Sequence, residues 1–161
     1  MSQYNYSMKE YKKEHMARVV GRDMPISIKQ TQMISNAIRN KNIAYAKKYL
    51  AEVIDKKRAV KFTKFNMDMG HKTKIGPGRY PMKACGEILK LIASLESNAQ
   101  FKGLNTADLY ISHIIPQKAA AQYRHGRRYG RKAKSTHLEM VVEERKPEAK
   151  KWLREISLIK N

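Results

Sequence analysis

The spacing of apolar residues changes several times along the chain and predicts a strand, three helices and two further strands. Residues 16–22 form a short apolar run that also carries bases, which indicates a strand. Residues 27–38 and 43–54 repeat apolar side chains three and four positions apart, as does the stretch 81–102. Because that spacing lines up apolar side chains on one helical face, we expect three amphipathic helices.

Local signals mark the expected ends of these helices. Ser27 and Gln30 form a capping-box pattern, in which each side chain would bind a free backbone N–H of the first turn. Pro81 suits the first turn of the third helix, and Gly103 suits the position that follows its last turn. The buried stripe expected on the third helix comprises Cys85, Ile88, Leu89, Ile92, Leu95 and Ala99.

Farther along the chain the period shortens to two, which is typical of strands. Residues 109–115 and 137–143 both alternate between two faces. One face of the first run carries Leu109, Ile111, His113 and Ile115. Two such runs around an acid-free, mostly polar stretch predict a long antiparallel hairpin. We therefore expect an α+β fold, in which the hairpin and the first strand form a small sheet.

Three segments fall outside these elements. Residues 1–15 are polar with scattered tyrosines, and we expect an arm over the surface. Residues 60–80 form a basic, glycine-containing loop, longer than a compact domain normally has without a functional reason. Within residues 146–161, Pro147 and Glu148 are predicted to open a short C-terminal helix. With 161 residues and no internal repeat, the chain is predicted to be one domain, its extended hairpin spanning residues 106–145.

The charge of the chain points to a polyanionic partner. Lys and Arg total 34 against 14 Asp and Glu, a formal net charge of +20 at pH 7. Such an excess repels itself in a compact protein unless a polyanion neutralises it. Hydrophobic residues make up 42% of the chain, far more than in a disordered basic tail. No acid lies between Asp108 and Glu139, an interval whose bases are Lys118, Arg124, Arg127, Arg128, Arg131, Lys132 and Lys134.

Little in the sequence indicates catalysis, a cofactor or a metal. The five histidines are scattered singly, and the one cysteine, Cys85, can form neither an internal disulfide nor a thiolate zinc site. No Gly-Lys-Ser or Gly-Lys-Thr follows the glycines of residues 70–78. No apolar run approaches the ~18 residues of a membrane span. We therefore predict a protein with no enzyme activity, cofactor, metal or membrane contact, located in the cytosol or nucleus.

Residues 118–134 carry the clearest binding signal. They combine arginines and lysines with Tyr123, Tyr129, Gly126 and Gly130. Arginine can bind phosphate through two hydrogen bonds and can stack on bases. Tyrosines add stacking faces, and glycines let the backbone approach a crowded polyanion. The pattern predicts an extended hairpin that inserts into RNA.

A second interpretation is a basic helix-turn-helix or chromatin-like DNA-binding protein. Residues 27–58 resemble a helix-turn-helix. However, Leu50, Val53 and Ile54 commit much of the second helix to the core, and the bases spread over every element. A-form RNA, which a protein contacts over a large area through its shape and its phosphates, fits this spread of basic residues better than DNA does.

Three motifs, in this order along the chain, carry a family resemblance. They are GHKTK with GRYPMKA (residues 70–74 and 78–84), ESNAQFKGLNTADL (96–109) and HGRRYGRKAKSTHLEMVVEE (125–144). Over roughly residues 16–145 the chain resembles the universal large-subunit ribosomal protein called L-twenty-two in bacteria, in its archaeal and eukaryotic form.

The resemblance implies a structural constituent of the large subunit of the cytosolic ribosome. Its implied partners are large-subunit ribosomal RNA, neighbouring ribosomal proteins around the peptide exit tunnel, and the nascent polypeptide. We expect the globular part to bind RNA through Arg18, Arg22, Lys29, Arg58, Lys61, Lys64, Lys72, Lys74, Arg79, Lys83 and Lys118. The hairpin tip would line the tunnel with Tyr123, Arg124, His125, Arg127, Arg128, Tyr129, Arg131, Lys132 and Lys134.

Overall fold

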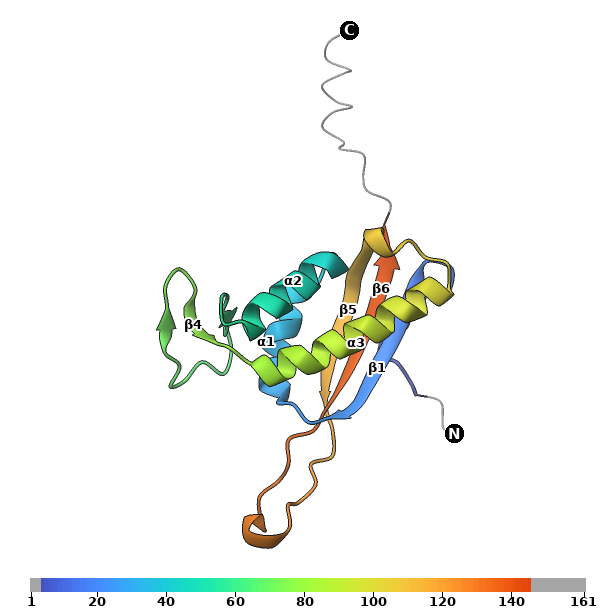
Figure 1. Cartoon of the computed structure of the whole chain (residues 1–161). Coiled ribbons are helices and arrows are strands. Elements are labelled where there is room, and N and C mark those ends of the chain that lie inside the picture. Colours follow the sequence, from blue (N-terminus) through green and yellow to red (C-terminus); the bar gives the residue numbers. More distant parts are fainter. Residues whose placement is uncertain (1–3, 146–161) are drawn as a thin grey trace.

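The computed structural model describes residues 4–145 and confirms a mixed α+β architecture (Figure 1). Its main sheet is antiparallel and has the strand order β1-β6-β5. These strands are β1 (Met16–Met24), β5 (Leu109–Lys118) and β6 (Thr136–Glu144). The predicted hairpin and the predicted first strand therefore belong to one sheet. The helix expected within residues 146–161 lies outside the described residues.

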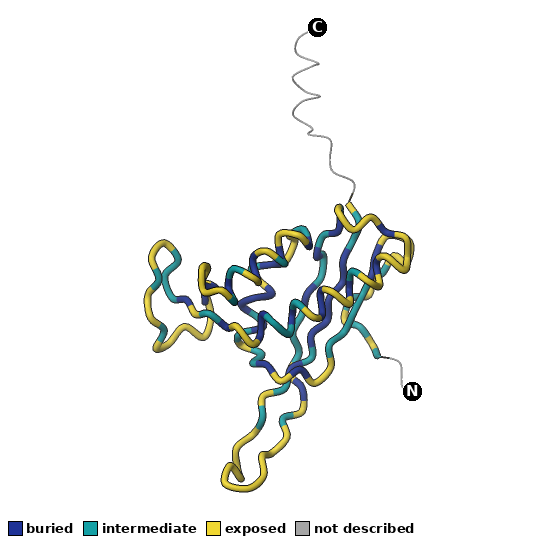
Figure 2. The backbone as a smooth tube through the Cα atoms, viewed as in Figure 1, coloured by how far each residue is buried: buried dark blue, intermediate teal, exposed yellow. Residues whose placement is uncertain are grey.

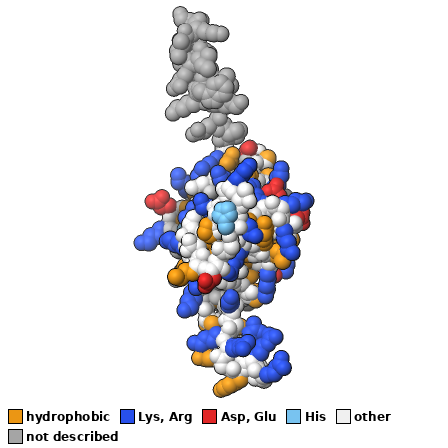
Figure 3. Space-filling view, turned by 90° about the vertical axis from the view of Figure 1, so that its left-hand side faces the viewer, with side chains coloured by type: hydrophobic (Ala, Val, Ile, Leu, Met, Phe, Trp, Pro, Cys, Tyr) orange, Lys and Arg blue, Asp and Glu red, His pale blue; other side chains and the backbone are white. Residues whose placement is uncertain are grey.

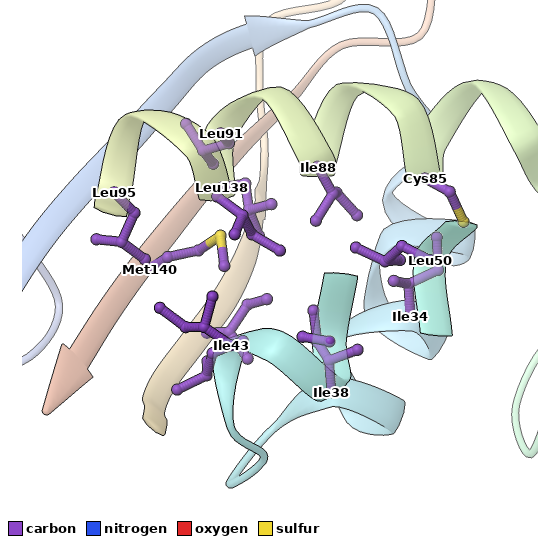
Figure 4. Packing of buried hydrophobic residues seen from close by; sticks show 14 of the residues in the cluster. Ile34, Ile38, Ile43, Leu50, Cys85, Ile88, Leu91, Leu95, Leu138 and Met140 are labelled. Atoms are coloured by element: carbon purple, nitrogen blue, oxygen red, sulfur yellow. The ribbon is translucent and has the colours of Figure 1, made fainter. Parts of the chain in front are cut away.

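Helices cover one face of this sheet (Figure 1). They are α1 (Ile28–Ile38), α2 (Ile43–Ile54) and α3 (Met82–Phe101). α3 packs on β1 and α2, while α1 packs on β5. Figure 4 shows apolar side chains from the helices and from β6 meeting in one cluster, with Leu50, Ile88 and Leu138 among them. Each fully buried Leu or Ile contributes about 1.5–3 kcal/mol relative to an exposed one, so this cluster holds helices and sheet together.

The helix ends follow the predicted positions, but one predicted hydrogen-bond pattern is wrong. α1 begins after Ser27, whose side chain makes no capping hydrogen bond. Instead, the backbone N–H and the hydroxyl of Thr31 both donate to the carbonyl of Ser27, at 2.9 Å each, and close the first turn. At the end of α3, Gly103 adopts φ 74°. Its N–H donates to Gln100 (2.9 Å) and that of Leu104 donates to Ala99 (3.1 Å), which confirms the glycine cap.

The predicted core faces need two corrections. A β-bulge between Ile111 and His113 shifts the register of β5 against β6. Because one extra residue reverses the alternation, Ile114 is fully buried, whereas His113 and Ile115 lie on the opposite face. On α3, Leu89 is only half-buried, since the stripe turns toward Leu91 as the helix crosses β1.

Residues 60–80 are not the plain loop that the composition predicts. They form a second, small antiparallel sheet with the order β2-β4-β3. Its strands are β2 (Val60–Lys61), β3 (His71–Lys72) and β4 (Gly76–Arg79). We call residues 60–80 the lobe, which extends from the side of α1 and α2 in Figure 1. Strands of two to four residues, built from Lys, Gly and Pro, carry too little apolar alternation to be recognised.

Candidate nucleic-acid interface

The hairpin extends beyond the sheet through residues 119–135, which follow β5 and precede β6 (Figure 1). A few main-chain contacts hold its two sides together. Tyr123 forms an isolated bridge with Lys132, and the N–H of Arg124 donates to the carbonyl of Arg131 at 2.8 Å. At the tip, residues 126–128 form a short 3₁₀ turn. Thus the segment is ordered and is not a random tail. We call residues 119–135 the arm.

The side chains of this arm are free for a partner. Figure 2 shows that the projecting part is almost entirely exposed, and Tyr129 is 83% exposed. Basic side chains gather on it without an acidic one in the view of Figure 3. None of the ion pairs in residues 4–145 involves a base of the tip. The ammonium of Lys132 lies 4.9 Å from the ring centre of Tyr123, so cationic and aromatic groups adjoin here.

Predicted bases from distant parts of the chain come together around the stem of the arm. One hollow beside the stem is lined by Lys29, Lys118, Lys132 and Lys134, and a second by Lys83, Arg124, Lys132 and Lys134. We call these six bases the stem surface. They come from α1, α3 and both sides of the hairpin, and no acid among the described residues lines either hollow. A concave surface of one charge sign focuses attraction on a polyanion.

A third hollow, here called the lobe groove, lies between α1, the lobe and the hairpin stem. Its basic lining comprises Lys29, Arg79 and Lys134. Its apolar lining comprises Phe62, Phe65, Met67 and Met69. The guanidinium of Arg79 donates to the backbone carbonyl of Asp68 at 3.3 Å, which fixes its orientation.

The remaining lobe bases lie apart from this groove. Lys61, Lys64 and Lys74 are exposed, whereas Lys72 is half-buried with its ammonium 5.4 Å from the ring centre of Tyr80.

Arg18 and Arg22 belong to a different surface, on β1. The guanidinium of Arg18 lies 4.4 Å from the ring centre of Tyr6 and 4.6 Å from that of Tyr11. The guanidinium of Arg22 lies 5.0 Å from the ring centre of Tyr4. The N-terminal tyrosines therefore hold both guanidinium groups in place, as cation–π contacts do.

Arg58 also lies apart from the stem surface, directly after α2. Its guanidinium lies 3.5 Å from a carboxylate oxygen of Glu52 and 4.7 Å from the ring centre of Tyr49. α2 would be the recognition helix of a helix-turn-helix, yet it buries Leu50 and Val53 completely. The exposed residues of α2 are Ala44, Tyr45, Lys48 and Ala51, of which one is basic, so no observation favours the DNA-binding interpretation.

Sequence reasoning missed a buried polar cluster on the outer face of the sheet. Glu139 is fully buried there, and its carboxylate accepts hydrogen bonds from the hydroxyl of Tyr4 (2.6 Å) and the N–H of Ser7 (2.9 Å). The amide of Gln117 also donates to it, at 2.7 Å. Burial alone would raise the pKa of Glu139, but the hydrogen bonds from Tyr4 and Ser7 and the nearby His113 lower it below its usual range. In the sequence, an acidic residue within an alternating strand did not indicate this contact.

The described part of the chain offers few other groups that could take part in a reaction. Cys85 is fully buried, and burial raises the pKa of its thiol to about 12, so the nucleophilic thiolate does not form near neutral pH. Within residues 4–145, no group of three or more metal-ligating side chains is placed to hold a metal ion. In the same part of the chain, every helix is too short or too polar to cross a membrane.

Comparisons with known proteins agree on one family. Residues 19–143 match the family model described as ribosomal protein L22p/L17e. The large ribosomal subunit protein uL22 of Archaeoglobus fulgidus is 37% identical over 153 residues, which cover 90% of this chain and 99% of that protein. The protein of the same name from Thermofilum pendens is 39% identical over 119 residues, covering 73% and 78%. That from Zea mays is 32% identical over 157 residues, covering 91% and 92%.

Proposed function

Because this chain belongs to the ribosomal protein L22p/L17e family, we propose that it is a structural, non-enzymatic constituent of the large ribosomal subunit that binds and stabilises ribosomal RNA. The observation that carries the proposal is the acid-free arm standing on the stem surface. Bases from α1, α3 and the hairpin meet there, so one RNA region that binds them would fix the globular part and the arm together.

Phosphate contacts supply the affinity in this account. Each basic side chain that neutralises a phosphate releases condensed counterions from the RNA, and that release favours binding. Arg124, Arg127, Arg128 and Arg131 can each bind a phosphate with two hydrogen bonds, and Tyr123 and Tyr129 offer stacking faces. RNA held on several surfaces of one rigid protein loses conformational freedom, which stabilises its folded form.

We further propose that the arm lines the peptide exit tunnel of a cytosolic ribosome, where it contacts the nascent polypeptide. Neighbouring ribosomal proteins around the tunnel complete the set of partners. The support is the shape and composition of the arm: it projects from the globular part, carries no acid, and exposes cationic and aromatic side chains. Such an arm can enter an RNA mass, whereas an arm with carboxylates would be repelled by phosphates.

Shortening the arm tests this proposal. Residues 123–134 are replaced by an Asn-Gly turn, which suits a two-residue hairpin. The core lies outside this segment, so the shortened protein should fold and enter large subunits. Chemical probing of the tunnel RNA in those purified subunits should then show increased reactivity where the arm is missing.

A full-length variant that keeps both the charge and the length of the arm serves as the control. Arg127→Lys, Arg128→Lys and Arg131→Lys together keep the charge and the reach, so the tunnel RNA should stay largely protected. If the shortened protein is incorporated and tunnel reactivity is unchanged, the arm does not line the tunnel. If the unaltered protein does not enter the subunit, the structural role itself is wrong.

A further inference from the structure

The lobe groove has a lining that phosphate binding alone does not explain. We propose that it binds one unstacked base of RNA, with the base stacked on Phe65 and the adjoining phosphates on Lys29, Arg79 and Lys134. The inference rests on the proposed function, since it specifies which feature of the RNA this surface recognises.

Large apolar side chains are left in solvent at this groove. Met67 is 86% exposed and Phe65 is 45% exposed. Phe62 is buried and Met69 is half-buried, and both pack against the hydrophobic core, so the groove is anchored to the folded body. Exposed apolar surface rimmed by polar groups is typical of an interaction site.

The backbone at Phe65 is constrained as well. Its φ is 57°, in the left-handed region that large side chains rarely adopt. The ammonium of Lys29 lies 5.1 Å from the centre of its ring. This cation–π contact orients the ring at the surface, where it can serve as a stacking platform.

The charges around the groove indicate which class of molecule binds there. Lys29, Arg79 and Lys134 come from α1, β4 and the hairpin stem, and within residues 4–145 no acidic residue lines the groove. An apolar side chain of another protein would fill the apolar part and leave three cations unpaired. A nucleotide satisfies both parts, because its base is flat and apolar on its faces and its phosphates are anionic.

An unpaired nucleotide fits better than a duplex. Bases inside an A-form helix are already stacked on each other and cannot reach an aromatic side chain. A bulged or looped-out base has a free face, and stacking on an aromatic side chain favours its binding whatever the base.

A binding experiment with the isolated full-length chain tests the site. The probes are an RNA hairpin with a single bulged 2-aminopurine and a fully paired hairpin of the same length. The protein should quench the fluorescence of the bulged base. Phe65→Leu keeps an apolar side chain and the same backbone constraint but removes the aromatic face. It should weaken binding of the bulged RNA on the order of 5- to 100-fold and leave the paired RNA unchanged.

Phe101→Leu is the matched control, because Phe101 is 94% exposed at the end of α3 and does not line the groove. It should bind both probes as the unaltered protein does. If Phe65→Leu also behaves like the unaltered protein toward the bulged probe, the base site is wrong.

Large subunits that carry each variant separate this inference from the proposed function. If both variants are incorporated and one RNA base becomes reactive only in subunits that carry Phe65→Leu, the result supports the site. If both variants are incorporated and no RNA base changes its reactivity with Phe65→Leu, the base site is wrong and the ribosomal role is unaffected. A groove filled by a neighbouring protein would give this result. Failure of the unaltered protein to enter the subunit overturns the proposed function and the inference with it.

Discussion

Four hydrogen bonds end on the carboxylate of Glu139, on the face of the sheet opposite the helices. Three of them come from Tyr4 and Ser7, so one acidic side chain ties the N-terminal segment to the middle strand. A buried carboxylate is tolerated only when its oxygens are satisfied, and here they are. The contact also places Tyr4 and Tyr6 against Arg22 and Arg18, which positions two of the candidate RNA-binding residues.

The docking of the N-terminal segment should depend on pH. The pKa of Glu139 in the folded protein is lower than its usual 4.5, so its charge stabilises the docked state above that pH. Protonation should remove this contribution as the pH falls below 4.5 toward the lowered pKa. Hydrogen exchange or limited proteolysis of residues 4–15 in the isolated protein should therefore increase in that range.

Glu139→Gln provides the comparison. The neutral amide should weaken the docking by about 1–3 kcal/mol, the usual cost of losing hydrogen bonds to a charged group. It should also remove the dependence on pH in that range. Equal pH profiles for the two proteins would show that another group controls the docking.

Cys85 is a core residue whose removal should cost stability only. Cys85→Ala leaves a small cavity against the helices, so we expect a loss of about 1–2 kcal/mol in the free energy of unfolding. Urea denaturation measures that loss. RNA affinity should stay unchanged, and the native thiol should resist alkylation, because burial raises its pKa to about 12. Rapid alkylation that abolishes RNA binding would contradict this assignment.

Among the helices and strands, apolar spacing was sufficient to predict each element that buries a continuous apolar stripe. α1, α2, α3 and the strands of the main sheet follow from it, because one face of each packs on the same core. The bulge in β5 could not be predicted, since the loop between α1 and α2 pairs with the backbone of Ile111 there. That pairing joins residues far apart in the chain and has no local signal.

The candidate site was predictable only in part, for the same reason. The acid-free run predicted the arm, and the family resemblance predicted the basic residues of the lobe as RNA-binding. The stem surface joins Lys29, Lys83 and Lys118 by tertiary packing, which no spacing along the chain reveals. The Phe-Thr-Lys-Phe-Asn-Met-Asp-Met stretch of the lobe is a weak signal of apolar side chains within a basic segment, and only the fold shows that they share one groove.

The end of α3 offers a test at this scale. Gly103 has φ 74°, a conformation that costs a residue with a side chain about 1–2 kcal/mol. Gly103→Ala should therefore lower the free energy of unfolding by roughly that amount, as measured by urea denaturation. Gly70→Ala is the control, because an added methyl group meets nothing within 4 Å at either glycine and, of the two, only Gly103 has a positive φ. Equal stability of the two variants would show that the glycine cap is not required.

For the whole molecule, a net charge of +20 has to be neutralised by its partner. RNA binding by the isolated protein should therefore depend strongly on salt. If Z phosphates are neutralised, the log–log slope should be on the order of −0.9Z on duplex RNA, or −0.7Z on single strands. With about 6–10 contacts, raising salt from about 50 to 200 mM should weaken binding by about 10³ to 10⁵. A nearly flat titration would contradict the electrostatic account.

Sedimentation of the tagged protein through a high-salt gradient measures whether the protein is a constituent of the large ribosomal subunit. A constituent of the large subunit is held by many surfaces at once, including the arm, the stem surface and the lobe. We therefore predict that the protein migrates with the large subunit and stays with it at a salt concentration that removes loosely bound basic proteins. Release into the light fractions, or recovery with chromatin in the pellet, would contradict the account.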